Sequence, residues 1–162
     1  MKKAIFFATL LSVSLIFALT AFAIDYPLGT IIPEGVKVTK YGEGEVDLLK
    51  DIKGSNKLLV FFNTACAQCL KEIKWLVDNV DISKLRLVSI DMIGEPAVIR
   101  YEASFLGGVG AIFYVDPDFE LAQSFGLTYT PSTIMIDKDG KVVSRTSGYE
   151  RVHQAKYREF LK

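Results

Sequence analysis

The sequence predicts an α/β protein with a central mixed sheet flanked by helices, on three observations. A continuous apolar run at residues 58–62 has the length of a strand buried on both faces. Strand-like and helix-like segments then alternate, which is typical of parallel βαβ units with right-handed crossovers. Near the end of the chain, Asp139-Gly140 lies between two apolar runs. This pair is a strong hairpin signal, so antiparallel strands are expected on one side of the sheet.

The first half of the chain supplies the following elements in order. Residues 24–40 are predicted as an extended lead-in, because prolines and glycines separate their isolated apolar residues. Residues 41–56 hold a short apolar cluster that ends in a Gly-Ser-Asn turn. After the strand at 58–62, helical spacing of apolar residues predicts a helix over 66–82. A second strand is predicted over 85–90.

The second half of the chain continues the alternation. Glu95-Pro96 opens a predicted helix over residues 95–106, because proline is favoured in the first turn. A strand follows over 111–115, and Asp116-Pro117-Asp118 supplies caps for a short helix over 119–125. The remaining predicted elements are the hairpin strands at 133–136 and 141–145 and a last helix at 149–161.

Composition fits one soluble domain. The 162 residues are 50% hydrophobic and 23% charged, which excludes a disordered or collagen-like chain. The 139 residues after the first 23 carry 17 basic and 19 acidic side chains. This near-neutral balance predicts no binding of nucleic acid and no electrostatic attraction to an acidic membrane surface.

The N-terminal segment predicts export. A basic pair at residues 2–3 precedes an uncharged run, and Ala21-Phe22-Ala23 supplies a small-x-small cleavage pattern, so residues 1–23 are predicted to be a signal peptide. An uncleaved anchor is the alternative, because the uncharged residues 4–24 are long enough to cross roughly 30 Å of hydrocarbon. In both cases the domain lies in an oxidising compartment, where disulfides persist.

The two cysteines of the chain form a Cys66-Ala67-Gln68-Cys69 motif between a buried strand and a helix. Two cysteines are too few for a disulfide-stapled scaffold or a four-cysteine zinc site. Free N–H groups and the helix dipole at a helix start lower the pKa of a thiol, so Cys66 is the predicted attacking sulfur. Cys69 follows almost one turn later and can resolve the mixed disulfide. We expect no metal and no organic cofactor.

Glu72 is a candidate proton-transfer group for Cys69. A helical wheel places both cysteines within the apolar arc of the helix and places Glu72 just beyond its edge, about 60° from Cys69. A half-buried carboxylate there would have a raised pKa and could exchange protons with Cys69. The geometry leaves open a solvated carboxylate beside Lys71.

With these elements in place, the sequence resembles the thioredoxin superfamily. Within it, the sequence is similar to the exported, membrane-tethered or periplasmic thiol–disulfide oxidoreductases that are related to the cytochrome c maturation reductases. The resemblance covers about residues 42–162 and is most specific at 58–72 and 125–140. It implies a thioredoxin-like domain over 41–162 with an extra βα unit at 85–106.

The resemblance also implies roles for individual residues. Pro131 would be cis and face the disulfide, the backbone of Thr130 and Pro131 would pair with an incoming peptide, and Glu72 matches the family's carboxylate six residues after the first cysteine. The implied activity is reduction of protein disulfides, with protein thiols and disulfides as partners and a membrane protein as electron donor. We expect a monomer outside the cytoplasm.

Three positions depart from the family pattern. Ala65 stands where tryptophan is usual, Gln68 where proline is usual, and Val60 where thioredoxin itself carries a buried acid. The residues between the cysteines match neither strong oxidants nor thioredoxin, so the direction of electron transfer stays open on this motif alone.

Two other uses of the same fold are alternatives. Copper delivery needs a third ligand, and His153 in the last helix is the only histidine of the chain. A thiol peroxidase needs a proline and a hydroxyl residue ahead of its cysteine, whereas Thr64 lies two residues before Cys66 and no proline precedes it nearby.

Overall fold

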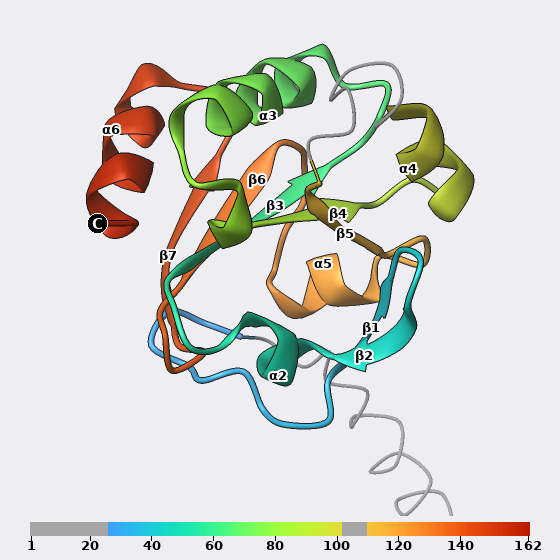
Figure 1. Ribbon diagram of the computed structural model, residues 1–162, viewed down its shortest axis with the longest axis horizontal. Helices are drawn as coiled ribbons and strands as arrows, with labels where there is room; N and C mark the ends of the chain where they lie inside the picture. The colour runs from blue at the N-terminus through green and yellow to red at the C-terminus, as the bar shows by residue number, and fades with distance from the viewer. Residues whose placement is uncertain (1–25, 102–109) are drawn as a thin grey trace, which may run out of the picture.

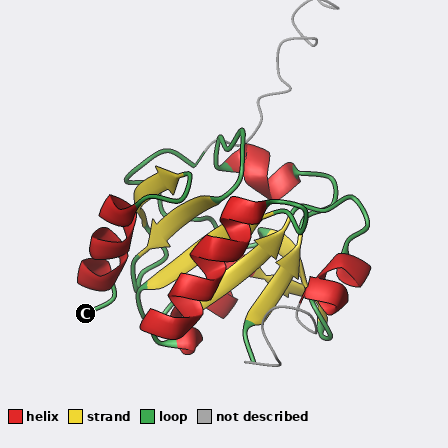
Figure 2. Ribbon diagram, turned by 90° about the horizontal axis from the view of Figure 1, so that it is seen from above, coloured by secondary structure: helices red, strands yellow, loops and turns green. Residues whose placement is uncertain are grey.

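The computed structural model describes residues 26–101 and 110–162, and in these residues helices cover a seven-stranded sheet on both faces (Figures 1 and 2). The predicted signal peptide at 1–23 and the end of the predicted helix, 102–106, lie outside the described residues. Among the described residues, no helix combines the length and the apolar character needed to cross a membrane.

The sheet is mixed, as predicted, with the strand order β2-β1-β5-β4-β3-β6-β7. The three strands β3, β4 and β5 are parallel, and the other strands pair antiparallel with their neighbours. The strands are β1 (Lys37–Lys40), β2 (Gly44–Asp47), β3 (Lys57–Phe62), β4 (Leu85–Ser89), β5 (Ile112–Val115), β6 (Ser132–Ile136) and β7 (Val142–Ser147). The helices are α2 (Leu48–Ile52), α3 (Ala67–Asn79), α4 (Glu95–Tyr101), α5 (Glu120–Ser124) and α6 (Arg151–Phe160), with a 3-10 turn, η1 (Ile82–Lys84).

The central strand β3 is buried on both faces. Leu59 and Phe61 pack in one apolar cluster with side chains of α2 and α5. Leu58, Val60 and Phe62 pack in a second cluster with side chains of α3, α4 and α6. Figure 1 shows these two groups of helices on opposite sides of the sheet. Burial on both faces explains why this strand has a continuous apolar sequence.

Helix α3 is shorter than the predicted helix over 66–82, so that prediction was wrong at its end. The helix ends at Asn79, and Val80 is extended. Asp81 then accepts a hydrogen bond from the Ser83 N–H (2.9 Å) and starts the separate turn η1. The apolar spacing did not reveal this break, because Val80 and Ile82 pack against the same cluster as the helix.

The segment predicted as an extended lead-in, residues 24–40, contains a strand of the sheet. Strand β1 pairs with β5 through Thr39 and Val115, and it forms with β2 a hairpin that the sequence analysis did not identify. Upstream of β1, Tyr26 and Ile32 are buried in the cluster that contains α2 and α5. The described part of this segment therefore contributes to the core.

The predicted hairpin near the C-terminus is present as β6 and β7. Gly140 in its turn has a φ of 86°, which favours glycine. A Cβ atom at this position would also collide with the side chain of Leu49. The glycine thus allows both the turn and the close approach of α2.

The parallel pairing of β3 and β4 positions the functional site. Phe62 lies opposite Ser89, so the two strands end at the same edge of the sheet. The loop that leads into α3 therefore lies beside the residues that follow β4.

Candidate active site

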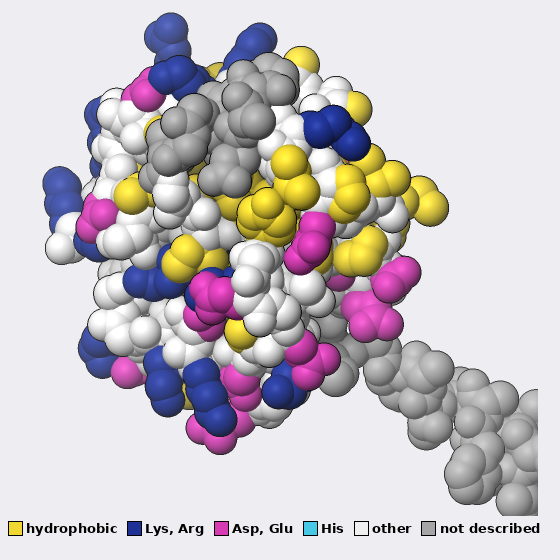
Figure 3. Space-filling view, turned by 45° about the vertical axis from the view of Figure 1, so that its right-hand side comes forward, with side chains coloured by type: hydrophobic (Ala, Val, Ile, Leu, Met, Phe, Trp, Pro, Cys, Tyr) yellow, Lys and Arg dark blue, Asp and Glu magenta, His cyan; other side chains and the backbone are white. Residues whose placement is uncertain are grey.

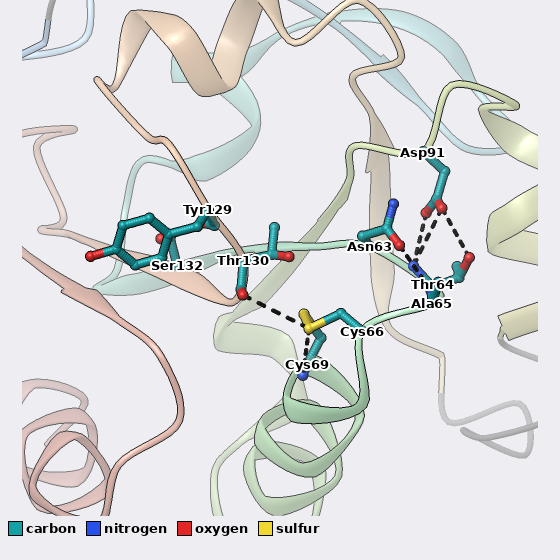
Figure 4. Close-up of a disulfide and its surroundings, with 9 residues drawn as sticks. All are labelled: Asn63, Thr64, Ala65, Cys66, Cys69, Asp91, Tyr129, Thr130 and Ser132. Atoms are coloured by element: carbon teal, nitrogen blue, oxygen red, sulfur yellow. Dashed lines mark hydrogen bonds between the residues drawn. A yellow bond between two sulfur atoms is a disulfide. The ribbon is translucent and has the colours of Figure 1, made fainter.

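The Cys66–Cys69 pair forms a disulfide at the start of α3, with a Cα–Cα distance of 5.2 Å (Figure 4). Cys66 is half-buried, whereas Cys69 is fully buried in the cluster beneath α3. Only Cys66 therefore presents its sulfur towards a partner, as the sequence analysis predicts.

Cys66 is the N-cap of α3, and its Sγ accepts a hydrogen bond from the Cys69 N–H (3.1 Å). The helix start adds partial positive charge at the same point. Both effects favour a negatively charged sulfur, so they stabilise a thiolate on Cys66 relative to the thiol.

Hydrogen bonds hold the loop before Cys66 in place. The Thr64 N–H and hydroxyl donate to the Asp91 carboxylate at 3.1 and 2.9 Å, as Figure 4 shows. The Ala65 N–H donates to the Asn63 side chain (2.9 Å), and the Cys66 N–H donates to the Asn63 carbonyl (3.0 Å). Asp91 is buried and also accepts from the Ser89 hydroxyl (2.8 Å). The loop is therefore fixed to the end of β4.

The Thr130-Pro131 peptide bond is cis, as the family resemblance implies. The Thr130 carbonyl oxygen lies 3.8 Å from the Cys66 Sγ (Figure 4). Pro131 is buried. Because a disulfide sulfur carries no proton, this is a contact in the oxidised protein, and a thiol at Cys66 could donate across it. The structure thus brings Cys66 and the Thr130-Pro131 loop together.

Glu72 lies deeper than the helical wheel predicts. It is 2% exposed rather than half-buried, because α6 and β6 cover the edge of the arc that the wheel left open. Its Oε1 accepts from the hydroxyls of Thr133 and Tyr157, each at 2.8 Å. Among the described residues its Oε2 is buried and has no hydrogen-bond partner. The solvated alternative beside Lys71 is therefore wrong.

Burial raises the pKa of Glu72 above its ordinary value. The hydrogen bonds from Tyr157 and Thr133 and the charge of His153 act in the opposite direction, but the cost of desolvation is larger. This direction agrees with the raised pKa that the sequence analysis expected for a carboxylate near Cys69.

His153 lies on α6, where its Nδ1 is 3.0 Å from the Gly148 carbonyl oxygen. Within residues 26–101 and 110–162, no group of three or more histidine, cysteine, aspartate or glutamate side chains could hold a metal ion.

Two cavities of the described residues differ in how they lie relative to the Cys66–Cys69 disulfide. The smaller, of about 210 Å³, is lined by Thr130 and by apolar side chains that include Phe61, Ile90 and Tyr129. The larger, of about 630 Å³, lies between residues 33–39 and 115–121, and neither cysteine lines it. Neither cysteine lines the smaller cavity either, but Thr130, whose carbonyl oxygen contacts the Cys66 Sγ, links it to the redox pair.

Comparison with known proteins assigns the family. The Redoxin family profile matches residues 27–161. The chain belongs to the redoxin family. This redoxin is 29% identical over 128 residues to the thiol–disulfide oxidoreductase ResA of Bacillus thuringiensis subsp. konkukian. The alignment covers 74% of this chain and 69% of that protein. It is 28% identical over 102 residues to ResA of Bacillus subtilis, and this alignment covers 62% of this chain and 57% of that protein.

Solved structures establish the thioredoxin-like fold of this redoxin. The thioredoxin domain of a thiol–disulfide oxidoreductase from Bacteroides vulgatus superposes with a TM-score of 0.67 at 20% identity, covering 84% of this chain and 99% of that one. StoA from Bacillus subtilis superposes with a TM-score of 0.58 at 15% identity, covering 82% and 100%. Together with the ResA relatives, these findings identify this redoxin as a thiol–disulfide oxidoreductase of the thioredoxin superfamily.

The sequence analysis missed two residues of this redoxin's site. Asp91 follows β4, and the rule that functional side chains gather at the carboxyl ends of neighbouring parallel strands could have found it. Tyr157 has no such signal, because only its place on the buried side of the last helix can be read from the sequence. Its proximity to Glu72 depends on how α6 packs against α3.

Proposed function

We propose that this redoxin reduces disulfide bonds of proteins outside the cytoplasm and receives its electrons from a membrane protein. The observation that supports this most directly is the half-exposed Cys66 sulfur, hydrogen-bonded at a helix start and facing the cis Thr130-Pro131 loop. An attacking thiol needs that exposure and that stabilisation of its thiolate.

The reaction follows from the different positions of the two sulfurs. In the dithiol form, the Cys66 thiolate attacks the substrate disulfide, forms a mixed disulfide and expels one substrate thiolate. The Cys69 thiol then gives its proton to Glu72 and attacks the Cys66 sulfur, which expels the second substrate thiolate. The substrate gains two electrons, the protein loses two, and the leaving thiolates take up the protons. A dithiol donor reverses these steps.

Glu72 is suited to accept the Cys69 proton. It follows Cys69 by three residues on α3, so the two side chains lie on the same side of the helix. A carboxylate whose pKa is raised by burial is a better base than an ordinary carboxylate. Water has little access there, because Cys69 and Glu72 are both buried.

The surface around Cys66 offers contacts for a polypeptide. The Thr130 backbone borders the 210 Å³ cavity, which could take an apolar side chain of the substrate. Hydrophobic side chains also gather on the face that carries α4 (Figure 3). Met92 and Ile93, which follow Asp91 directly, are 82% and 54% exposed. The exposed Ala65 replaces the tryptophan usual in the family and leaves more room at Cys66.

The place of action rests on the sequence. The predicted signal peptide or anchor at 1–23 supports a periplasmic or extracytoplasmic location, and the family resemblance supports a role in cytochrome c maturation. We further propose that the protein acts as a monomer on protein thiols and disulfides.

Trapping tests the proposal. Cys69→Ser should accumulate a mixed disulfide at Cys66 in cells, which mass spectrometry would identify, and Cys66→Ser should lose exchange activity on a protein disulfide. Full activity of Cys66→Ser would contradict the proposed nucleophile. A reduction potential above about −150 mV would make the protein an oxidant rather than a reductase.

A further inference from the structure

The buried Glu72 carboxylate, three residues after Cys69, connects to the last helix through a directed chain of hydroxyl groups. The Tyr157 hydroxyl donates to Glu72 Oε1 (2.8 Å) and lies 2.6 Å from the Thr146 hydroxyl. A phenol has one proton, and Tyr157 gives it to Glu72. The 2.6 Å contact therefore needs the proton of the Thr146 hydroxyl, which donates to the Tyr157 oxygen in preference to the Thr133 carbonyl at 3.5 Å. Thr133 donates to the same Oε1 from β6 (2.8 Å). The chain therefore runs from β7 through α6 to the carboxylate on α3.

This arrangement makes the two oxygens of Glu72 unequal. Oε1 accepts two hydrogen bonds, whereas Oε2 is buried without a hydrogen-bond partner among the described residues. A proton on the carboxyl group is thus favoured at Oε2, because a proton at Oε1 would compete with the two donors. A buried oxygen without a donor is costly in a structural ion pair or network, but it is the oxygen that a proton acceptor requires.

We infer that Tyr157 is a positioning residue for Glu72, and that it orients the carboxylate so that Oε2 takes the proton that leaves the Cys69 Sγ. The inference rests on the proposed function of Glu72. It adds that α6, the C-terminal helix, controls the step in which Cys69 attacks the mixed disulfide. In that step the Cys69 S–H bond breaks, the proton moves to Oε2, and the sulfur electron pair forms the bond to Cys66.

Tyr157 keeps its proton over a wide pH range, so it can donate to Glu72 throughout that range. Burial raises the pKa of Tyr157 far above neutrality, so its hydroxyl stays a donor. Besides Tyr157, the titratable group that acts on Glu72 is His153 on α6, and Cys69 lies three residues before Glu72 on α3. Thr133 on β6 and Thr146 on β7 carry no charge. A hydrogen bond to a carboxylate favours its ionised form, so loss of the Tyr157 hydroxyl should raise the pKa of Glu72.

A single-turnover reaction separates the two chemical steps. The reduced protein is mixed with the aryl disulfide dithiobis(nitrobenzoic acid), and the released thionitrobenzoate is followed by its absorbance. Attack by Cys66 releases the first equivalent and attack by Cys69 releases the second, so the protein ends as the disulfide and two aryl thiolates form. The pH dependence of the second phase reports the proton acceptor.

Tyr157→Phe is expected to move the pH midpoint of the second phase upward and to leave the first phase unchanged. Below the midpoint the second phase should slow by about tenfold, which is the loss of one hydrogen bond to a charged group. Tyr114→Phe is the matched control, because it removes another buried hydroxyl that donates to a carboxylate, that of Asp51, in the opposite cluster. This control should keep the wild-type midpoint.

Glu72→Gln separates failure of this inference from failure of the proposed function. If Glu72→Gln leaves the pH profile of the second phase unchanged, then Glu72 is not the proton acceptor. If Glu72→Gln removes the pH-dependent limb but Tyr157→Phe keeps the wild-type midpoint, then only the role of Tyr157 is wrong. If Tyr157→Phe misfolds, difluorotyrosine at position 157 provides the test in its place. This side chain is a stronger donor and should move the midpoint downward, so an unmoved midpoint would contradict the inference.

Discussion

The two sulfurs of one disulfide lie in opposite environments. Cys66 is half-exposed, accepts a backbone N–H and contacts the Thr130 carbonyl, whereas Cys69 is buried beneath α3 on the side of Glu72. A backbone N–H and the helix start stabilise a thiolate at the exposed sulfur. The buried sulfur can react only if its proton has somewhere to go, because water has little access to it. In the proposed reaction, attack by Cys66 and resolution by Cys69 therefore depend on different parts of the fold.

The buried side carries a carboxylate although the central strand has no acid there. Val60 stands on β3 where the family resemblance places the buried acid of thioredoxin, and it pairs directly with Thr133 on β6. The Thr133 hydroxyl binds Glu72. The carboxylate therefore reaches the same side of the sheet from α3, and the strand position can stay apolar.

The largest expected difference between the two sulfurs is their rate of alkylation. In the reduced protein, iodoacetamide should modify Cys66 at least about 100-fold faster than Cys69, because Cys66 is more exposed and its thiolate is stabilised. Peptide mapping after short exposures measures both rates. Equal rates in the folded protein would remove the distinction on which the proposed order of attack rests. Denatured protein, in which both cysteines should react alike, is the control.

The next largest effect concerns the loop that holds Cys66. Asp91→Ala removes the acceptor for the Thr64 N–H and hydroxyl, and it should lower the free energy of unfolding by about 2 kcal/mol. It should also slow the first phase of the single-turnover reaction and spare the second. Asp91→Asn keeps one acceptor oxygen and should lose less in both measurements. A slower second phase in Asp91→Ala would mean that the two sides of the disulfide are not independent.

Much of the fold could be predicted because local patterns carried it. The burial of β3 on both faces, the position of Cys66 at a helix start and the Asp139-Gly140 turn are properties of short segments. The β1–β2 hairpin was missed because Lys37–Lys40 and Gly44–Asp47 are short and mostly polar, and they pair through the backbone at the edge of the sheet. A periodic pattern cannot reveal strands that contribute so few buried side chains.

The site was predictable to the same degree. Cys66 and Cys69 were found because the motif spacing identifies them, and the Thr130-Pro131 loop was found because the family resemblance implies it. The depth of Glu72 was not, since a helical wheel describes one helix and cannot include α6, which covers Glu72 from 85 residues further along the chain. Side chains from separate layers meet only after tertiary packing.

A smaller effect should appear in the stability of the buried side. Burial raises the pKa of Glu72 in the folded protein above its unfolded value, so its favourable contribution is complete below the unfolded pKa and is lost as the pH rises through the folded pKa. Glu72→Gln cannot ionise and should lack this loss. Urea unfolding of the oxidised proteins measures this effect. As the pH rises from acidic to mildly alkaline, the free energy of unfolding of Glu72→Gln should increase by about 1 kcal/mol relative to that of wild type. The exposed Glu159→Gln should gain nothing, and a pH-independent difference for Glu72→Gln would contradict a raised pKa.

The smallest expected effect separates charge from hydrogen bonding at Glu72. The charge of His153 lowers the pKa of Glu72 without a direct hydrogen bond between them, and His153 is only half-buried. His153→Gln should therefore slow the second phase about twofold. Added salt should reduce this difference, because salt screens charges more than it weakens hydrogen bonds. If His153→Gln slows that phase more than Tyr157→Phe does, the charge on α6, rather than the Tyr157 hydroxyl, controls the proton affinity of Glu72.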